Sequence, residues 1–356
     1  DTTELFQKID GLKQSIEDDE ETLKNIESDL QNFLLKLPNT PDEDIVAGDK
    51  ENNEVLFYNK EKFVFDFTNK DHVDLATDLK LIDYERAAKI SGRGTWIYSN
   101  LGARLEWALI NFFIDEHLKD GYEFMMVPHL LNYESGLTAG QFPKFEEDVF
   151  WLQGEEPRKF LLPTAETALI NLHRNEILSL EDLPRKYFGY TPCYRREAGS
   201  YRSEERGMIR GYQFNKVEMI QFTTPEQSDK AFEELMGKAE GLMRKLGLHY
   251  RVSKLAAGDI AFGMARTFDI EVWLPSIGIY KEVSSVSNSR AFQARRGKIR
   301  YRNADGEVQF CHTLNGSGLA TSRLLPAILE QNQMADGSVK VPEVLIPYLG
   351  GISVLK

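Results

Sequence analysis

Apolar residues near the start of the chain recur at alternating steps of four and three, broken once at Asp19. This spacing is typical of a coiled-coil helix, whose apolar seam must pack against a partner helix. The sequence holds no second run of this kind, so a helix that simply dimerises is an alternative interpretation of the pattern. The seam consists of Leu5, Ile9, Leu12, Ile16, Leu23, Ile26, Leu30 and Phe33.

The hydrophobic pattern further along predicts a linker and a large domain. Pro38 and Pro41 end the first helix, because proline cannot continue one, and an acidic, polar stretch follows. Amphipathic helices are predicted at 101–119 and 225–246, and the first of them leads into a strand that ends at Pro128. We therefore predict an arm at 1–37, a linker at 38–53 and one domain at 54–356.

The densest candidate chemistry lies in two strand-like segments on either side of a charged, glycine-containing connection at 198–211. Because side chains alternate along a strand, Arg195 and Glu197 share one face of the first segment and Arg196 points the other way. Alternation divides the second segment into a charged, aromatic face with Phe214, Lys216 and Glu218 and a core-like face with Val217 and Met219.

A sheet surface of this kind suits a substrate that carries both a phosphate and a ring. Arginine forks onto phosphate or carboxylate groups, and a ring can pack between Phe214 and the guanidinium of Arg210. A solvated hairpin with cross-strand ion pairs explains the same residues, and this stretch alone does not decide between the two.

Composition narrows the function classes. A chain of 356 residues with 42% hydrophobic content can bury a full core. Its net charge of −13 argues against a protein that coats nucleic acid generally, since phosphate binding needs concentrated positive charge. One basic cluster leaves local tRNA binding open: Arg295, Arg296, Lys298, Arg300 and Arg302.

The same sequence predicts a cytoplasmic protein that does not enter a membrane. No apolar run approaches the roughly 18 residues of a membrane span, and the acidic, polar start does not resemble a signal peptide. Cys193 and Cys311 are expected to be reduced, buried thiols. The histidines show no spacing typical of a zinc site.

Residues 194–197, Tyr-Arg-Arg-Glu, resemble motif 2 of the class II aminoacyl-tRNA synthetases, with Arg210 as the second arginine and Phe214 as the stacking aromatic. Other strings resemble those of one family in that class, the bacterial-type seryl-tRNA synthetases, and they follow the same order along the chain as in that family. The resemblance covers roughly residues 37 to 351. The strings are LPTAE (162–166), FDIEVW (268–273), EVSSVSN (282–288), FQARR (292–296) and TLNGSGLA (313–320).

The resemblance implies an α+β fold, in which an antiparallel sheet is flanked by helices and preceded by a coiled-coil arm. The family's arm is a helical hairpin that cradles tRNA, and only its returning helix is present here. The other helix therefore either precedes this sequence or has been lost, which puts tRNA binding in doubt. The helix at 101–119 and the strand ending at Pro128 resemble motif 1, through which a homodimer would form.

The implied reaction is a serine–tRNA ligation in two steps. Serine and ATP give seryl-adenylate and pyrophosphate, and serine then passes to tRNA(Ser); tRNA(Sec) is a further substrate that the family allows. The resemblance gives Arg195 and Arg323 catalytic roles and assigns Mg²⁺ to Glu282 and Ser285. It assigns ATP to Arg195, Arg196, Glu197, Arg210, Gly211, Phe214, Glu282, Val283, Ser284, Ser285 and Arg323, and L-serine to Thr164, Ala165, Glu166, Arg195, Glu218, Asn315 and Ser317.

Two other functions fit parts of the pattern. A ligase that loads amino acids onto carrier proteins would also activate an amino acid, but those relatives use zinc, and no Cys/His set stands at the matched positions. A non-catalytic scaffold protein of synthetase ancestry could lose its active-site charges freely, whereas this chain retains all the matched ones.

Overall fold

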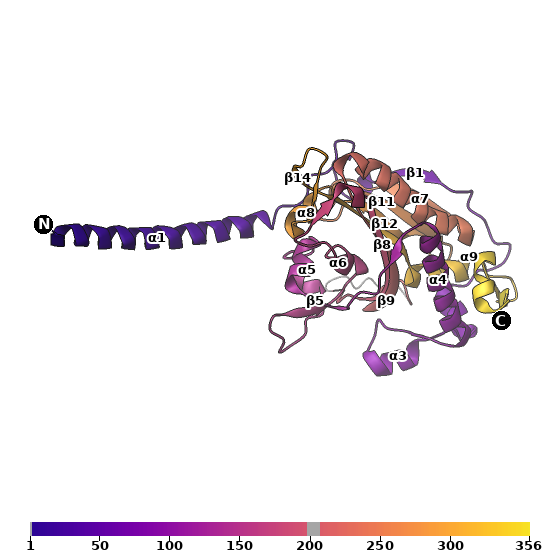
Figure 1. The fold of residues 1–356 in the computed structure, drawn as a ribbon. Helices are drawn as coiled ribbons and strands as arrows, with labels where there is room; N and C mark the ends of the chain where they lie inside the picture. Colours follow the sequence, from indigo (N-terminus) through magenta and orange to yellow (C-terminus); the bar gives the residue numbers. More distant parts are fainter. Residues whose placement is uncertain (1, 198–206) are drawn as a thin grey trace.

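The computed structural model describes residues 2–197 and 207–356, and its centre is an eight-stranded sheet (Figure 1). The strand order is β1-β10-β11-β12-β15-β9-β8-β4, and every pair is antiparallel except β4 with β8. Part of the predicted connection, 198–206, lies outside the described residues. The strands are β1 Glu54–Tyr58, β4 Glu123–Phe124, β8 Arg185–Tyr194, β9 Gln213–Thr223, β10 Tyr250–Lys254, β11 Arg266–Leu274, β12 Ile279–Asn288 and β15 His312–Ala320.

The predicted hairpin of β8 and β9 is confirmed. The two strands pair from Arg185 opposite Phe222 to Tyr194 opposite Gln213. Val217 and Met219 are fully buried in the core behind the sheet, as alternation predicts. The opposite face of β9 therefore carries its charged and aromatic side chains towards the front.

Two groups of helices cover the sheet (Figure 1). Behind it, α2 His72–Asp78, α4 Asn100–Lys119, α7 Ser228–Leu246 and α9 Thr321–Gln331 share the main hydrophobic core. On the front lie the short helices α5 Tyr133–Thr138, α6 Ala165–Leu169 and α8 Phe292–Gly297. This arrangement confirms the predicted α+β fold with a flanked, mostly antiparallel sheet.

Smaller elements complete the body around these layers. One further helix and nine short strands are described: α3 Tyr84–Ser91, β2 Ile82–Asp83, β3 Ile97–Tyr98, β5 Leu130–Asn132, β6 Lys159–Leu161, β7 Ile177–Ser179, β13 Arg300–Arg302, β14 Val308–Phe310, β16 Val339–Lys340 and β17 Val354–Leu355. These nine strands form one three-stranded and three two-stranded sheets that are separate from the main one. Among the described helices, none is long and apolar enough to pass through a bilayer.

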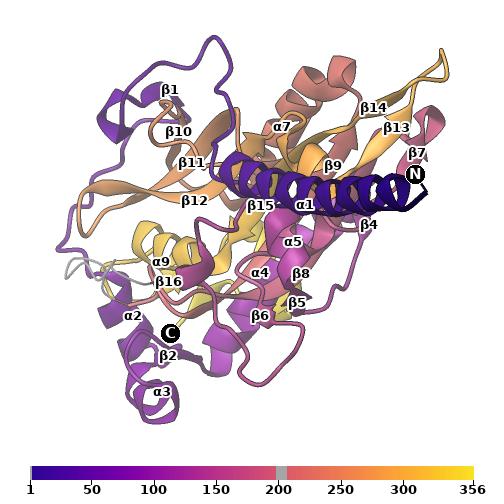
Figure 2. The same cartoon turned by 90° about the vertical axis from the view of Figure 1, so that its left-hand side faces the viewer.

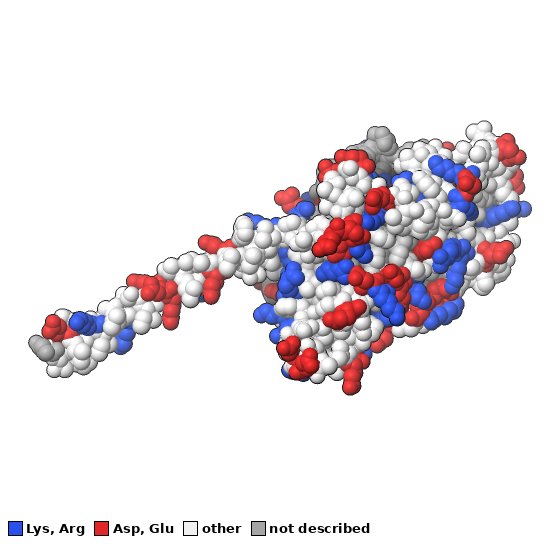
Figure 3. Space-filling view, turned by 90° about the horizontal axis from the view of Figure 1, so that it is seen from above, with Lys and Arg blue, Asp and Glu red and all other residues white. Residues whose placement is uncertain are grey.

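The predicted N-terminal helix is present as α1, Thr2–Leu34, which projects away from the body (Figure 1). No residue of α1 is buried, and each side chain of its apolar seam is at least 38% exposed. Figure 2 views the molecule from the side on which α1 projects. The side of the arm visible in Figure 3 carries acidic and basic groups separated by uncharged surface. The seam is therefore an open apolar face on an otherwise polar rod.

The segment after α1 is tied to the body by hydrogen bonds. The Asn39 backbone N–H donates to the carbonyl of Phe262 at 2.9 Å. The Asn39 side-chain amide donates to the carbonyls of Gly263 at 3.1 Å and Ser289 at 2.9 Å. The Asp42 carboxylate accepts from the Arg290 guanidinium at 2.7 and 3.1 Å. The base of the arm is thus held in a defined place.

The predicted helix at 101–119 is confirmed as α4, but the strand after it is shorter than expected. Strand β4 ends at Phe124, and the last ladder bond comes from the Met125 N–H to the Phe188 carbonyl at 2.8 Å. Beyond it, Met126 is 88% exposed, and Pro128 has no N–H to donate to a ladder. The pairing with β8 therefore stops before Pro128.

Candidate active site

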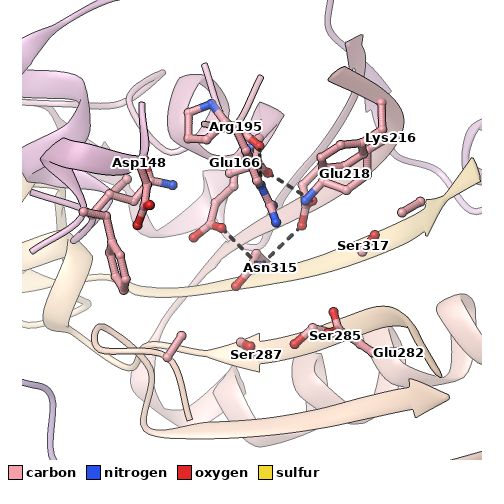
Figure 4. Close-up of a pocket in the computed structure, with 18 of the residues that line it drawn as sticks. Asp148, Glu166, Arg195, Lys216, Glu218, Glu282, Ser285, Ser287, Asn315 and Ser317 are labelled. Atoms are coloured by element: carbon pink, nitrogen blue, oxygen red, sulfur yellow. Dashed lines mark hydrogen bonds and ion pairs between the residues drawn. The ribbon is translucent and has the colours of Figure 1, made fainter. Parts of the chain in front are cut away.

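A cavity of about 570 Å³ opens on the front of the sheet (Figure 4). Its floor is formed by β9, β12 and β15, and its walls include the loops at 139–149 and 261–264. Most of the predicted site residues line it: Thr164, Glu166, Arg195, Glu197, Arg210, Gly211, Phe214, Glu218, Glu282, Val283, Ser285, Asn315, Ser317 and Arg323. Segments distant in sequence therefore meet in one place.

Three predicted site residues lie outside the lining of the cavity. Ala165, the first residue of α6, is fully buried in the core of the front layer. The Arg196 side chain turns away and donates to the Glu147 carbonyl at 3.2 Å. The Ser284 hydroxyl faces the back of β12, where it donates to the Ser317 carbonyl at 2.5 Å. Alternation along the strand explains the position of Ser284.

An irregularity in β12 brings Glu282 and Ser285 to the same face. The register pairs Ile270 with Ser284 and Glu271 with Glu282, which leaves Val283 without an opposite residue. On a regular strand, two side chains that are three residues apart, as Glu282 and Ser285 are, point to opposite faces. The extra residue of a β-bulge re-aims them. Both side chains therefore reach the cavity.

One end of the cavity is a buried polar cluster around Glu218 (Figure 4). Glu218 is fully buried and forms an ion pair with Lys216. Its carboxylate also accepts from the Thr164 hydroxyl and from the Asn315 amide, both at 3.3 Å. Among the described residues, neither Asn315 Oδ1 nor the Ser317 hydroxyl has a hydrogen-bond partner. Buried polar atoms normally have partners, so these two are available to a ligand.

Glu166 lies beside this cluster, and its pKa is raised above the ordinary value for a glutamate. Its carboxylate accepts from the Gln293 amide at 2.8 Å and lies 3.4 Å from the Asn315 amide nitrogen. Burial, helped by the negative charge of Glu218, raises the pKa of Glu166 to about 7, although the Gln293 hydrogen bond opposes the change. Glu166 can therefore gain or lose a proton near neutral pH.

The other end of the cavity is cationic and aromatic. The Arg195 guanidinium carbon lies 5.0 Å from the centre of the Phe214 ring, and its Nε donates to the Pro163 carbonyl at 3.2 Å. Arg323 donates to the Glu282 backbone carbonyl at 3.0 Å and lies 3.3 Å from its carboxylate. Arg210 pairs with Glu197. An anion with a flat ring suits these groups.

Glu282 is an ionised carboxylate at the mouth of the cavity. Burial on its own would raise the pKa of Glu282, but the guanidinium groups of Arg323 and Arg195 lower it below the ordinary value. A carboxylate and the nearby Ser285 hydroxyl are hard oxygen ligands, which magnesium prefers. No group of three or more His, Cys, Asp or Glu side chains in the described part of the chain could hold a metal ion by itself.

Sequence reasoning assigned no role to several residues that line or support the cavity. Lys216 was placed on the correct face by alternation, but nothing indicated that it pairs with Glu218 within the same strand. Gln293 lies within the FQARR string without a predicted function, yet it holds Glu166. Asp148 and Ser287 also line the cavity; Ser287 lies within the EVSSVSN string without an assigned role, and no motif includes Asp148.

Within the predicted basic cluster, Arg295, Lys298 and Arg302 are exposed, whereas Arg296 turns inward. The Arg296 guanidinium is stacked 4.4 Å from the Phe292 ring and donates to the carbonyls of Leu35 at 2.9 Å and Phe142 at 3.0 Å. Arg302 donates to the Gly306 carbonyl in its own hairpin. Arg296 is therefore a structural residue at the base of the arm.

Comparisons with known proteins agree with this geometry. Residues 150–332 match the family described as "tRNA synthetase class II core domain (G, H, P, S and T)". The chain is 60% identical over 350 residues to serine–tRNA ligase 2 of Clostridium acetobutylicum, spanning 97% of this chain and 82% of that protein.

Two solved structures are similar over nearly the whole chain. The seryl-tRNA synthetase of Pyrococcus horikoshii complexed with ATP superimposes with a TM-score of 0.90 at 34% identity, covering 94% of this chain and 79% of that one. The cytoplasmic serine–tRNA ligase of Naegleria fowleri in complex with AMP gives 0.88 at 32% identity, covering 95% and 80%. With this identity, this coverage and a cavity that joins the residues of its motifs, the chain belongs to the seryl-tRNA synthetases, the serine–tRNA ligases of class II.

Proposed function

We propose that this chain activates L-serine with ATP and transfers it to tRNA(Ser). The observation that carries the proposal is the polar end of the cavity, where Asn315 Oδ1 and the Ser317 hydroxyl stay unpaired among the described residues. The space beside them adjoins Arg195 and the carboxylates of Glu166 and Glu218. A small amino acid with a hydroxyl supplies the ammonium, the carboxylate and the hydrogen bonds that these groups lack.

The adenylation step needs two anions held together. In it, a carboxylate oxygen of serine attacks the α-phosphorus of ATP, and the bond to the leaving pyrophosphate breaks. Arg195 would bridge the two anions, since it lies between the polar cluster and Phe214. Arg323 and Arg210 would neutralise the phosphate chain. Arg195 and Arg323 are thus the proposed catalytic residues.

The adenine ring would lie against Phe214. In this arrangement Glu197 would accept from the exocyclic amino group, and the backbone near Gly211 would contact the nucleotide. The Arg195 guanidinium already lies over one face of Phe214, and Arg323 approaches the same end of the cavity from α9. A ring in this slot would be held between an aromatic face and cationic side chains.

Glu282 and Ser285 fit a magnesium ion that also binds phosphate. Two protein oxygens are what such an ion needs, because Mg²⁺ usually keeps several waters and takes further ligands from phosphates. When bound, it would neutralise the charge of the phosphates during displacement. The bulge at Val283, which turns both side chains to the cavity, supports the assignment.

Selection of serine would rest on hydrogen bonds, because a hydroxymethyl group offers little apolar surface. A site whose polar groups stay unpaired without a substrate hydroxyl rejects analogues that lack it. Glu218 would take the ammonium or hydroxyl, Ser317 would meet the hydroxyl, and Thr164 would support Glu218. Threonine differs only by one added methyl, so its exclusion would be steric and weaker.

We also propose that the protein is a homodimer that acts in the cytoplasm, where tRNA is charged. On α4 and the segment after it, several large apolar side chains are exposed, and a twofold partner would cover them: Trp107 at 53%, Leu118 at 50%, Phe124 at 37% and Met126 at 88%. The arm at 1–37 and its open seam would face tRNA, with tRNA(Sec) as a further substrate. The domain at 54–356 would carry the chemistry, and 38–53 would join the two.

The test is amino-acid-dependent ATP–pyrophosphate exchange with serine, threonine, alanine, glycine and cysteine in parallel. It reports adenylation alone, so the tRNA arm does not affect it. Exchange driven by serine alone supports the proposal. A different preferred amino acid keeps the reaction class but overturns the roles of Glu218 and Ser317. Folded, ATP-binding protein that gives no exchange would indicate a scaffold.

A further inference from the structure

Behind the sheet, directly opposite the cavity, lies a buried carboxylate that the reaction itself does not use. Glu106, on α4, is 3% exposed. One of its oxygens, Oε1, accepts from the Thr321 hydroxyl at 2.5 Å and from the Asn215 amide at 2.8 Å. The Thr321 hydroxyl also lies 3.2 Å from the Asn215 backbone carbonyl. Three elements thus meet at one carboxyl group.

The two partners of Glu106 stand beside the nucleotide end of the cavity. Asn215 lies between Phe214 and Lys216 on β9, and both of these neighbours line the cavity from the opposite face of the strand. Thr321 is the first residue of α9 and precedes Arg323 by two positions. A shift of Asn215 or Thr321 would therefore move Phe214 and Arg323 relative to each other.

We propose that Glu106 is a positioning residue for ATP, which fixes Phe214 on β9 and Arg323 on α9 by holding Asn215 and Thr321 from behind the sheet. It touches neither substrate nor the reacting atoms. The inference rests on the proposed function only in naming ATP as the ligand of these two residues. Its effect falls mainly on the nucleotide end, because Thr321 leads directly to Arg323, while Lys216, the other neighbour of Asn215, is also held by its ion pair with Glu218.

Because this carboxyl group can change its charge, the pH dependence of ATP binding gives a second readout for the proposal. Burial raises the pKa of Glu106 to about 7, although the hydrogen bonds from Thr321 and Asn215 lower it. The ionised form accepts these bonds more strongly, because charge-assisted hydrogen bonds are stronger than neutral ones. The hold on Asn215 and Thr321 therefore tightens as the pH rises through about 7.

Among the described residues, the titratable groups that face Glu106 from β3 and β8 are tyrosines, and these do not titrate in this range. Tyr98 faces it from β3, and burial raises the pKa of Tyr98 far above neutral pH. Tyr190, on β8, donates to Asn215 Oδ1 at 3.1 Å, and burial raises the pKa of Tyr190 to about 12. The Tyr98 hydroxyl also lies close enough to hydrogen-bond the Glu106 carboxylate, and this contact likewise lowers the pKa of Glu106.

The test uses Glu106→Gln and Thr321→Val in the full chain. ATP affinity is measured by calorimetry, and serine-dependent exchange is measured against ATP and serine from pH 6 to 8.5. In both variants we expect the Kd and KM for ATP to rise about tenfold at pH 8, the effect of losing a charge-assisted hydrogen bond. The KM for serine should change less than about twofold. The wild type should bind ATP more tightly as the pH passes 7, and Glu106→Gln should not.

A matched control separates positioning from a general loss of stability. Glu240, on α7, accepts from the buried Tyr250 hydroxyl at 2.7 Å, and the cavity lining does not include it. Glu240→Gln should lower the melting temperature and leave the ATP affinity and its pH dependence unchanged.

The experiment distinguishes a failure of the role of Glu106 from a failure of the proposed function. Variants that fold and keep wild-type ATP affinity and pH dependence overturn the role of Glu106, even if serine exchange is normal. If the wild type gives no serine exchange, the proposed function fails, and the calorimetry still decides the role of Glu106. If Glu106→Gln does not fold, Thr321→Val carries the test, because valine has the shape of threonine without its hydroxyl.

Discussion

Lys216 and Glu218 form an ion pair along a single strand, two positions apart on the face of β9 that forms the floor of the cavity. Glu218 is fully buried and Lys216 is 9% exposed. The pair is therefore largely removed from water, unlike the many surface ion pairs of this protein. Removal of one partner would leave the other charge buried and uncompensated.

Lys216→Met should destabilise the protein by about 3–5 kcal/mol, the usual cost of leaving one charge of a buried pair alone. Urea unfolding at neutral pH measures this change. The control is Lys238→Met, which removes a pair with Asp120 whose side chains are 33% and 23% exposed and should cost less than about 1 kcal/mol. Equal effects of the two substitutions would show that the environment of Glu218 is not special.

Serine binding should depend on pH through Glu166. Its pKa of about 7 lies above the ordinary value of 4.5 because of burial and the charge of Glu218. The ammonium of serine favours the ionised carboxylate, so binding should tighten as the pH rises from 6 to 8 and release a proton near pH 7. Calorimetry in buffers of different ionisation enthalpy measures this release. A Glu166→Gln variant that releases the same number of protons would contradict the assignment.

Ser317→Ala should weaken the preference for serine over alanine. The lost hydroxyl is one of two unpaired polar atoms in the cluster, so the ratio of kcat/KM values for serine and alanine should fall by roughly 5- to 160-fold, equivalent to about 1–3 kcal/mol. Parallel exchange assays with both amino acids give the ratio. Ser287→Ala is a matched control within the cavity, because its hydroxyl is already bonded to Thr267 at 2.9 Å. A larger loss of preference in Ser287→Ala than in Ser317→Ala would indicate that the substrate hydroxyl binds at Ser287 instead.

Arg195→Ala should abolish exchange by removing the charge between the two anions, with a loss of about 10²-fold or more in kcat. Its neighbour provides the control. Arg196→Ala removes an equal charge that bonds to the Glu147 carbonyl outside the cavity, and exchange should stay within about threefold of the wild type. Near-normal exchange by Arg195→Ala, with the fold intact by circular dichroism, would exclude its proposed role.

Asn39→Ala should loosen the contact between the arm and the cavity wall. It removes two side-chain hydrogen bonds to the carbonyls of Gly263 and Ser289, at a cost of about 1–2 kcal/mol. Amide hydrogen exchange should become faster in the loop at 261–264. Asn32→Ala, on the exposed part of α1, should leave that loop unchanged. Unchanged exchange in Asn39→Ala would show that other contacts hold the loop.

The sequence predicts well whatever depends on strong, local periodicity. The helix at 101–119 and the two faces of β9 follow directly from steps of 3.6 and 2, and Phe214, Lys216 and Glu218 do share one face. The short motifs also predict which distant segments meet at the cavity.

What the sequence does not predict depends on the neighbour of each element. The bulge at Val283 is a mismatch between β12 and β11, and it alone puts Glu282 and Ser285 on one face and leaves Ser284 behind. The length of β4 is decided by its pairing with β8. In the sequence Arg296 is one charge of a basic run, but the carbonyls that it bonds, those of Leu35 and Phe142, come from distant parts of the chain.

The attachment of α1 has a mechanical consequence. A helix of 33 residues rises about 1.5 Å per residue, so the arm is a lever roughly 50 Å long whose pivot lies at Asn39. A tilt of about 5° at the pivot displaces the tip by about 4 Å, more than the length of a hydrogen bond. The carbonyl groups that fix the pivot belong to Gly263 in the cavity wall and Ser289 at the end of β12. Small movements of the cavity wall and large movements of the arm tip would therefore be coupled through the contacts at the base of the arm, in which Asn39 acts together with the Asp42–Arg290 pair and the bond from Arg296 to the Leu35 carbonyl.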